Sequence, residues 1–107
     1  MNDLKWSDKE KRVARQAFEV ALAAELAELI ADFKVRAAAA TEPDDLWAIE
    51  EHLRQRRKEI DWQYDYRYSQ LIFIFARLLR DGRIREDQLF GLSEVKLSQI
   101  RRLASPE

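Results

Sequence analysis

The sequence predicts an all-α protein in which two long antiparallel helices form a dimeric helical bundle, with a small C-terminal helical head. Two stretches carry this prediction, because neither the first 42 residues nor the segment from Asp44 to Asp81 contains Gly or Pro. Charged residues make up 36% of the chain, against only two Gly and two Pro, which is typical of solvent-flanked helices rather than turn-rich sheets. At 107 residues, residues 1–107 are expected to form one domain.

The first helix is expected over residues 7–40. Ser7 and Glu10 have the spacing of a capping box, in which each side chain binds the backbone N–H group of the other residue. Apolar residues then recur mostly at steps of three, four or seven, which marks one face of a helix; they are Val13, Phe18, Leu22, Leu26, Leu29, Ile30 and Phe33. The many alanines favour helix and allow a neighbour to approach closely.

The second helix is predicted as one uninterrupted segment over residues 43–81. Pro43 suits a first helical turn because its φ is fixed, and Asp44 and Asp45 complement the helix dipole there. The short connection makes the two helices antiparallel neighbours. Gly82 follows where a left-handed residue is expected. The apolar stripe of this helix comprises Leu46, Ile49, Leu53, Ile60, Tyr64, Leu71, Ile74 and Leu78.

A helix of this length would measure about 55 Å, whereas a domain of this size has a radius of gyration of about 13 Å. Such a rod must lie against other rods, which the first helix and a second copy of the chain are expected to supply. Residues 71–79 are apolar on nearly every side, which implies burial from several directions. Residues 83–107 are therefore expected to form the head, with a short helix around Leu89, Phe90 and Leu92 and a last helix capped by Ser93.

Composition excludes several classes of function. The net charge of −1 lacks the positive field of a general nucleic-acid binder. The absence of Cys removes disulfides, thiolate nucleophiles and thiolate metal sites. The N-terminus lacks the apolar core of a signal peptide, and the longest strongly apolar run, 71–76, is too short to cross a bilayer. We therefore expect a cytoplasmic protein that does not insert into membranes.

No residue pattern indicates catalysis, a metal or a cofactor. His52 follows Glu50 and Glu51, but adjacent helical residues diverge by about 100° and cannot converge on one ion. Asp61 and Asp65 lie one turn apart among basic and aromatic residues, which favours ion pairs over a catalytic pair. Two glycines cannot build a phosphate loop or a dinucleotide fingerprint. The chain is expected not to be an enzyme.

A basic run interleaved with aromatic residues is the one feature that suggests binding. Charge with stacking is typical of single-stranded nucleic-acid sites, whereas Trp, Tyr and Arg are also enriched at protein–protein hot spots. A solvated, salt-bridged helix face is the third interpretation, because several acidic residues share this helix. The residues concerned are Arg54, Arg56, Arg57 and Lys58, with Trp47, Trp62, Tyr64, Tyr66 and Tyr68.

The same segment carries a family resemblance. The matching residues are Asp44–Trp47, Arg57, Glu59–Asp61, Tyr64–Asp65, Arg67, Ile72–Phe73, Phe75–Ala76, Leu78–Leu79 and Gly82, with weaker agreement at Leu89, Leu92, Lys96, Ile100 and Leu103. With these residues the chain resembles the fluorescence recovery protein family, the dimeric partners of orange carotenoid protein in cyanobacterial photoprotection. The match covers about the last two-thirds of the chain.

The resemblance implies a non-enzymatic function. Proteins of this family bind the photoactivated red form of orange carotenoid protein, chiefly through its C-terminal domain. They speed its return to the orange form and its release from the phycobilisome, which ends photoprotective quenching. A related carotenoid-binding protein is the alternative partner, and association with thylakoids would come through the phycobilisome. A homologous helical dimer that serves as a structural or adaptor module for a different partner is the alternative function.

The resemblance also implies site residues. The family's functional Trp and Arg fall on Trp47 and Arg57, and its functional acidic position falls on Glu51, where the family typically has Asp. Phe73 matches an aromatic contact residue of the head. Two positions depart from the family pattern: Glu50 replaces His, and Gln99 replaces a basic residue. The expected dimer interface comprises Leu29, Phe33, Leu46, Trp47, Glu51, Leu53 and Ile60.

Overall fold

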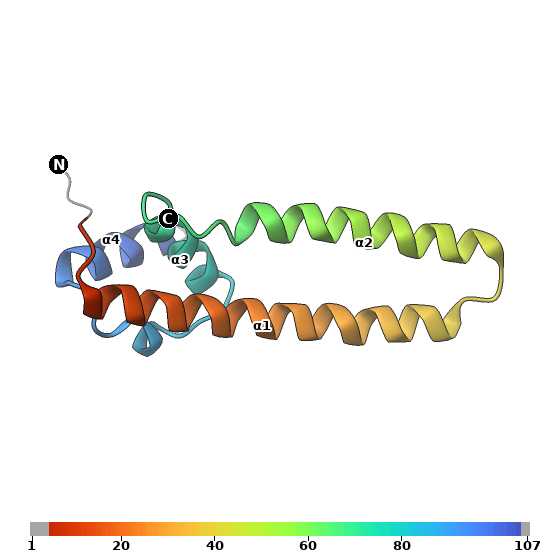
Figure 1. The fold of residues 1–107 in the computed structure, drawn as a ribbon, viewed down its shortest axis with the longest axis horizontal. Coiled ribbons are helices and arrows are strands. Elements are labelled where there is room, and N and C mark those ends of the chain that lie inside the picture. The colour runs from red at the N-terminus through yellow and green to blue at the C-terminus, as the bar shows by residue number, and fades with distance from the viewer. Residues whose placement is uncertain (1–4, 106–107) are drawn as a thin grey trace. The chain divides into compact units, whose positions relative to one another are not determined.

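The computed structural model describes residues 5–105, and all regular secondary structure within that range is helical. The α-helices are α1 (Asp8–Ala39), α2 (Pro43–Gln63), α3 (Leu71–Arg80) and α4 (Glu94–Ala104), and a 3-10 turn, η1, spans Glu86–Leu89 (Figure 1). The predicted all-α class is therefore confirmed. The chain divides into two compact units, a hairpin unit of residues 22–64 and a head unit of residues 1–21 and 65–107.

The hairpin unit pairs the C-terminal half of α1 with α2, and the two run antiparallel (Figure 1). The first helix ends at Ala39 and the second begins at Pro43, within one residue of the predicted boundaries. The capping box at the start of α1 also forms, because Glu10 N–H donates to Ser7 Oγ at 3.1 Å and Ser7 N–H donates to Glu10 Oε1 at 3.0 Å.

The prediction of one uninterrupted helix over residues 43–81 is wrong. α2 ends at Gln63, and helical structure resumes only at Leu71. Long-range contacts of aromatic side chains explain the break. Tyr66 packs edge-to-face on Phe18, with ring centroids 4.7 Å apart, and Tyr68 packs on Trp6 at 5.6 Å. Residues two apart on a helix point in nearly opposite directions, so a continuous helix could not turn both tyrosines toward the same packing surface.

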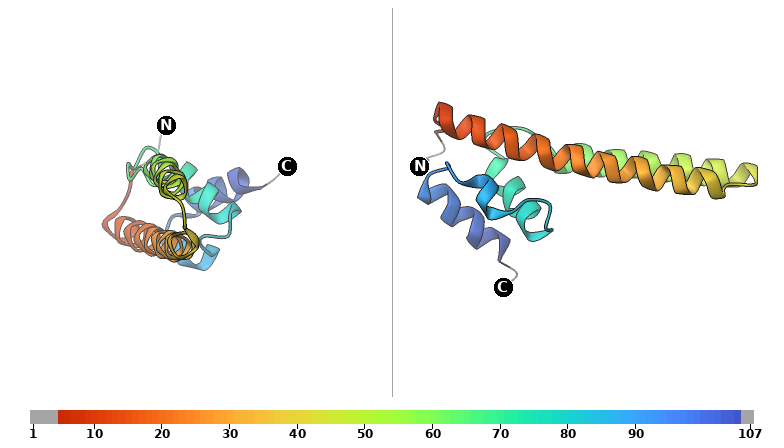
Figure 2. Two further views of the ribbon diagram at one scale, coloured as in Figure 1. Left: turned by 90° about the vertical axis from the view of Figure 1, so that its right-hand side faces the viewer. Right: turned by 90° about the horizontal axis from the view of Figure 1, so that it is seen from below.

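The head unit has its core around α3. Six of the ten residues of α3 are buried, which confirms the predicted burial of this segment from several directions. The buried residues are Leu71, Ile72, Ile74, Phe75, Ala76 and Leu78. α4 packs against α3 (Figure 2) and contributes buried Leu97 and Ile100. Ala14 and Ala17 of α1 are also buried in this unit. The head unit is therefore larger than the predicted 83–107 segment, because α3 and the start of α1 belong to it.

The turns of the head unit follow the sequence signals with one difference. Gly82 has φ of 75°, as expected after a helix, and Ser93 caps α4 by accepting from the Lys96 N–H group at 3.2 Å. The short helix predicted around residues 89–92 is instead a 3-10 turn that ends at Leu89. Phe90 and Leu92 lie beyond it in irregular backbone, where Gly91 has φ of 116°.

Candidate interaction surface

The Asp45 carboxylate anchors the start of α2. Asp45 Oδ2 accepts the backbone N–H groups of Thr41 at 2.9 Å and Glu42 at 3.0 Å. These two hydrogen bonds hold the pKa of Asp45 below its ordinary value. The first turn of α2 is thereby anchored one residue before Leu46 and two before Trp47.

Polar contacts with α1 define the inner face of α2. Buried Glu25 accepts the Tyr64 hydroxyl at 2.6 Å and the Arg56 guanidinium at 3.0 Å. Asp32 lies 3.2 Å from His52 Nε2, and the pKa of Asp32 is lowered, first by its hydrogen bond with Arg36 and then by His52. Because these contacts turn one side of α2 toward α1, the opposite side faces away from it.

The outer face of α2 carries charged and aromatic side chains in one continuous stripe. Trp47 is 63% exposed, and Arg57, with an 85% exposed side chain, lies 4.0 Å from Asp61. Arg54 donates to Glu50 at 2.7 Å and to Glu51 at 2.5 Å. Trp and Arg are among the residue types enriched at protein–protein hot spots, so the exposed Trp47 and Arg57 make this face suited to binding another protein.

A second exposed surface lies on the head unit. Phe73 is 53% exposed, although it lies on a helix whose other residues are mostly buried. It lines a shallow hollow with Ala76, Arg77, Arg80 and Leu103. Arg80 spans the hollow and donates to the Leu103 carbonyl oxygen at 2.8 Å. Gln99 is half-buried on α4.

The structure therefore separates the predicted partner-binding residues into two groups. The first group shares the outer face of α2: Trp47, Glu50, Glu51 and Arg57. The second group, Phe73 and Gln99, belongs to the head unit. Two residues of the hollow, Arg77 and Arg80, were not singled out from the sequence. Their signal is a basic residue four or seven positions after Phe73 on one apolar helix.

The residues expected at a dimer interface differ in how far the structure exposes them. Trp47 and Glu51 are exposed on the outer face of α2, Leu46 is 56% exposed near the start of that helix, and Phe33 is 39% exposed on α1. Leu29 and Leu53 are half-buried. Ile60 is only 7% exposed, because the hairpin of its own chain covers it, and it has little surface left for a second copy.

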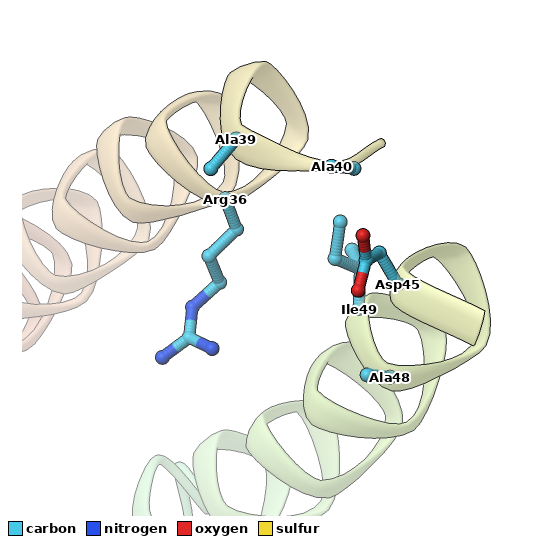
Figure 3. A pocket seen from close by; sticks show the side chains of 6 residues that line it. All are labelled: Arg36, Ala39, Ala40, Asp45, Ala48 and Ile49. Carbon is cyan, nitrogen blue, oxygen red and sulfur yellow. The ribbon is translucent and has the colours of Figure 1, made fainter. Parts of the chain in front are cut away.

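A further hollow lies at the closed end of the hairpin, between α1 and α2 (Figure 3). It is lined by Arg36, Ala39, Ala40, Asp45, Ala48 and Ile49. The lining is mostly small side chains, and the hollow opens widely to solvent, so it offers no enclosed site for a small ligand.

Two absences apply to residues 5–105. No group of His, Asp and Glu side chains there is arranged to hold a metal ion. None of the described helices has both the length and the apolar composition that crossing a bilayer requires.

Comparison with known proteins identifies the family. The family described as photoprotection regulator fluorescence recovery protein matches residues 6–104. The fluorescence recovery protein of Synechocystis sp. is 39% identical over 99 residues, which cover 92% of this chain and 91% of that protein. The solved structure of the Fremyella diplosiphon fluorescence recovery protein is 41% identical, with a TM-score of 0.88 over 94% of this chain and 98% of that one. The Synechocystis structure gives a TM-score of 0.87 at 39% identity, with the same coverage of each chain. The chain therefore belongs to the fluorescence recovery protein family of photoprotection regulators.

Proposed function

We propose that this protein is a non-enzymatic dimeric regulator that binds photoactivated orange carotenoid protein through the C-terminal domain of that partner. It accelerates reversion of the red form to the orange form and release from the phycobilisome, and it works in the cytoplasm. The observation that supports this proposal most directly is the family match over residues 6–104. Solvent exposure of Trp47, Arg57 and Phe73, the positions implied by the resemblance, is consistent with it.

The mechanism needs no covalent step. A surface that holds the two separated domains of the partner within reach raises their effective concentration and lowers the barrier to re-docking. The outer face of α2 and the Phe73 hollow offer apolar contact beside arginine side chains. Both features suit a protein partner rather than a small substrate.

Dimerisation is supported by exposed apolar residues on the hairpin. Leu26, Ile30 and Phe33 recur at helical spacing on α1 and are each at least 39% exposed, and Leu46 and Trp47 are exposed on α2. Surface stripes of this kind mark sites of protein association. A second copy of the chain is the occupant that would cover them in the free protein.

The direct test is red-to-orange recovery in the dark. Light-activated orange carotenoid protein is mixed with this protein, and the absorbance change is followed over time. We expect acceleration by the wild-type protein and at least a tenfold smaller effect from Trp47→Ala and Arg57→Ala, since hot-spot truncations commonly cost about 2 kcal/mol or more. Val95→Ala and Lys34→Ala are matched controls at other exposed positions.

Failure of the assay has a defined meaning. If stoichiometric excess of a folded, dimeric wild-type protein leaves recovery unchanged, the proposed partner is wrong. The adaptor function with a different partner would then be favoured, and the departures at Glu50 and Gln99 would be the first residues to examine.

A further inference from the structure

The two units of the chain carry opposite net charges. The head unit, residues 1–21 and 65–107, has 13 basic and 10 acidic side chains, whereas the hairpin unit, residues 22–64, has 6 basic and 10 acidic side chains. The net charge of −1 for the whole chain therefore combines a positive head with a negative hairpin. Such an asymmetry favours association of the positive unit with an acidic partner.

The positive charge of the head unit is densest at the start of α1. Residues 5–15 contain five basic residues and two acidic ones. Glu10, one of the two acids, is buried and paired with Lys96, so Asp8 is the only exposed acid in this stretch. The basic side chains are all exposed: Lys5, Lys9, Lys11, Arg12 and Arg15.

Two of the helical cations have no partner for their charged groups among residues 5–105. Lys11 and Arg15 each lie over a tyrosine ring, and Arg15 also lies 3.7 Å from a glutamate. Lys9 and Arg12 make no ion pair, side-chain hydrogen bond or ring contact within the described part of the chain. These two charges are therefore free to bind a partner.

The fold itself does not gain from the free charges. Lys9 lies in the first turn of α1, where the helix dipole favours acids and disfavours cations. Lys9 and Arg12 are three residues apart, so they are neighbours on the helix surface and repel each other. A partner that neutralises both charges would remove both penalties.

An exposed aromatic ring lies beside these cations. Phe90 is 60% exposed. The next residue, Gly91, packs so closely on α1 that an added β-carbon would lie 3.6 Å from Lys9 Cε. The Ser93 N–H group donates to Glu10 at 2.8 Å. The loop that carries Phe90 is thus fixed to the first turn of α1, and it holds the ring close to Lys9.

We propose that Lys9, Arg12 and Phe90 form a docking surface for an acidic segment of another protein, in which carboxylates flank an apolar side chain. The carboxylates pair with the two free cations, and the apolar side chain packs on the Phe90 ring. Lys5 and Lys11 extend the positive field around this surface. The inference goes beyond the proposed function and does not depend on it, because none of these residues belongs to the surfaces proposed for orange carotenoid protein.

A protein segment fits this surface better than a membrane or a nucleic acid does. Binding in a membrane interface needs an apolar helix face, but apolar residues at the start of α1, such as Ala14 and Phe18, are buried in the head unit. Single-stranded nucleic acids stack successive bases on several aromatic rings. The neighbouring rings of Tyr66 and Tyr68 pack on each other at 5.6 Å and are covered by cations, so they are not open to bases.

Two labelled peptides probe the surface by fluorescence anisotropy with the full chain. They have the same length and the same number of Glu residues, but one carries Leu at every fourth position and the other carries Ser there. We expect the wild-type protein to prefer the Leu peptide, and to bind both peptides more weakly as salt rises to about 0.15 M. Lys9→Gln with Arg12→Gln should weaken binding of both peptides at least about fivefold at low salt. Phe90→Ala should abolish the preference for Leu.

Matched variants control for charge and fold. Lys9→Arg with Arg12→Lys keeps both charges and should bind like the wild type. Lys34→Gln with Arg102→Gln removes two charges at other exposed positions and should change the affinity less than about twofold. In urea, the chain with Lys9→Gln and Arg12→Gln should unfold at a midpoint no lower than that of the wild type, because it loses an unfavourable interaction with the helix dipole.

The same measurements can overturn the proposal. A wild-type protein that binds neither peptide, or equal losses of affinity in the Lys9 and Arg12 variant and in the Lys34 and Arg102 control, would remove the docking surface. Tighter binding of an oligothymidylate or of phosphatidylglycerol vesicles than of the Leu peptide would assign the surface to a nucleic acid or a membrane instead. A change in sedimentation of the Lys9 and Arg12 variant without peptide would assign it to a second copy of the chain.

Discussion

Glu10 and Lys96 form a buried ion pair that joins the first turn of α1 to the first turn of α4. Lys96 Nζ lies 3.2 and 3.3 Å from the two carboxylate oxygens of Glu10, and the residues are 7% and 6% exposed. Glu10 also accepts the Ser93 N–H group at 2.8 Å, and Lys96 donates to the Lys5 carbonyl oxygen at 2.6 Å. The residue that completes the capping box of α1 is thus also the one that anchors the start of α4.

Removal of Lys96 should destabilise the head strongly. Lys96→Met leaves the Glu10 carboxylate buried with only backbone donors, and breaking a buried pair on one side costs about 3–5 kcal/mol. Urea unfolding followed by circular dichroism, at one fixed protein concentration, measures the loss. Lys9→Met on the exposed side of α1 is the control and should change stability by less than about 0.5 kcal/mol. A loss below about 1 kcal/mol for Lys96→Met would show that the pair does not stabilise the fold.

The free energy of unfolding should also fall at acid pH, because Glu10 becomes protonated. Burial alone would raise the pKa of Glu10, but hydrogen bonds from Ser7 and Ser93 and the Lys96 ammonium outweigh it and lower that pKa below 4.5. The unfolded chain therefore binds this proton more readily than the folded one. Ionised Glu10 contributes its full stabilisation at pH values above the pKa that this group has in the unfolded chain. That contribution is lost as pH falls through the lower pKa of the folded chain. Urea midpoints between about pH 6 and pH 3 should fall less steeply in Glu10→Gln than in the wild type. Equal slopes would contradict this assignment.

The break between α2 and α3 shows what the sequence alone could not predict. Helix boundaries near residues 8 and 43 follow from local signals, namely a capping box and a proline. The break after Gln63 has no such signal, because its cause is the packing of Tyr66 on Phe18 and of Tyr68 on Trp6, far away in the chain. The alternation of Tyr with charged residues over 64–68 has the period of an extended chain, and it is the one local indication of the break.

The sequence also predicted only part of the candidate site, namely the helix that carries it but not the burial of each residue. Helical periodicity places Trp47, Glu50, Glu51 and Arg57 on one helix, and the structure shows that they share its outer face. Periodicity places Ile60 on the apolar stripe of the helix, but it does not tell whether the same chain or a second copy covers that residue, and it does not assign Phe73 to the surface. Those assignments depend on where α1 and α4 pack, which is a tertiary property.

The Glu25 cluster should stabilise the hairpin measurably. Tyr64→Phe removes a 2.6 Å hydrogen bond to a carboxylate that is 5% exposed. Hydrogen bonds to charged groups contribute about 1.5–3 kcal/mol, so urea unfolding should show a loss in that range. Lys34→Met, at an exposed position of the same unit, is the control and should be near neutral. An unchanged midpoint for Tyr64→Phe would mean that the hydroxyl does not support Glu25.

Phe73 and Phe75 form a matched pair on α3 that separates binding from folding. Phe75 is fully buried, so Phe75→Ala should cost about 3–5 kcal/mol of stability. Phe73 is 53% exposed, so Phe73→Ala should cost less than about 1 kcal/mol. Phe73→Ala should nevertheless slow recovery of orange carotenoid protein in the dark assay. Full activity of a folded Phe73→Ala variant would remove the hollow on the head from the proposed docking surface.

The two glycines should respond very differently to the same substitution. Gly82 has φ of 75° and open space around it. Gly82→Ala should therefore lower the free energy of unfolding only by the strain of a left-handed backbone, about 1–2 kcal/mol. Gly91 has φ of 116°, and an added Cβ would lie 2.7 Å from Val13 Cγ2. Gly91→Ala therefore combines backbone strain with a steric clash against α1, and it should lose more stability than Gly82→Ala.

Val13→Ala removes the clashing methyl groups, so the cost of Gly91→Ala measured in a Val13→Ala background should fall toward that of Gly82→Ala. Urea unfolding of the four chains in this double-mutant cycle, together with Gly82→Ala, gives the coupling directly. Equal costs for Gly91→Ala in both backgrounds would show that Val13 is not the residue that requires glycine at this turn.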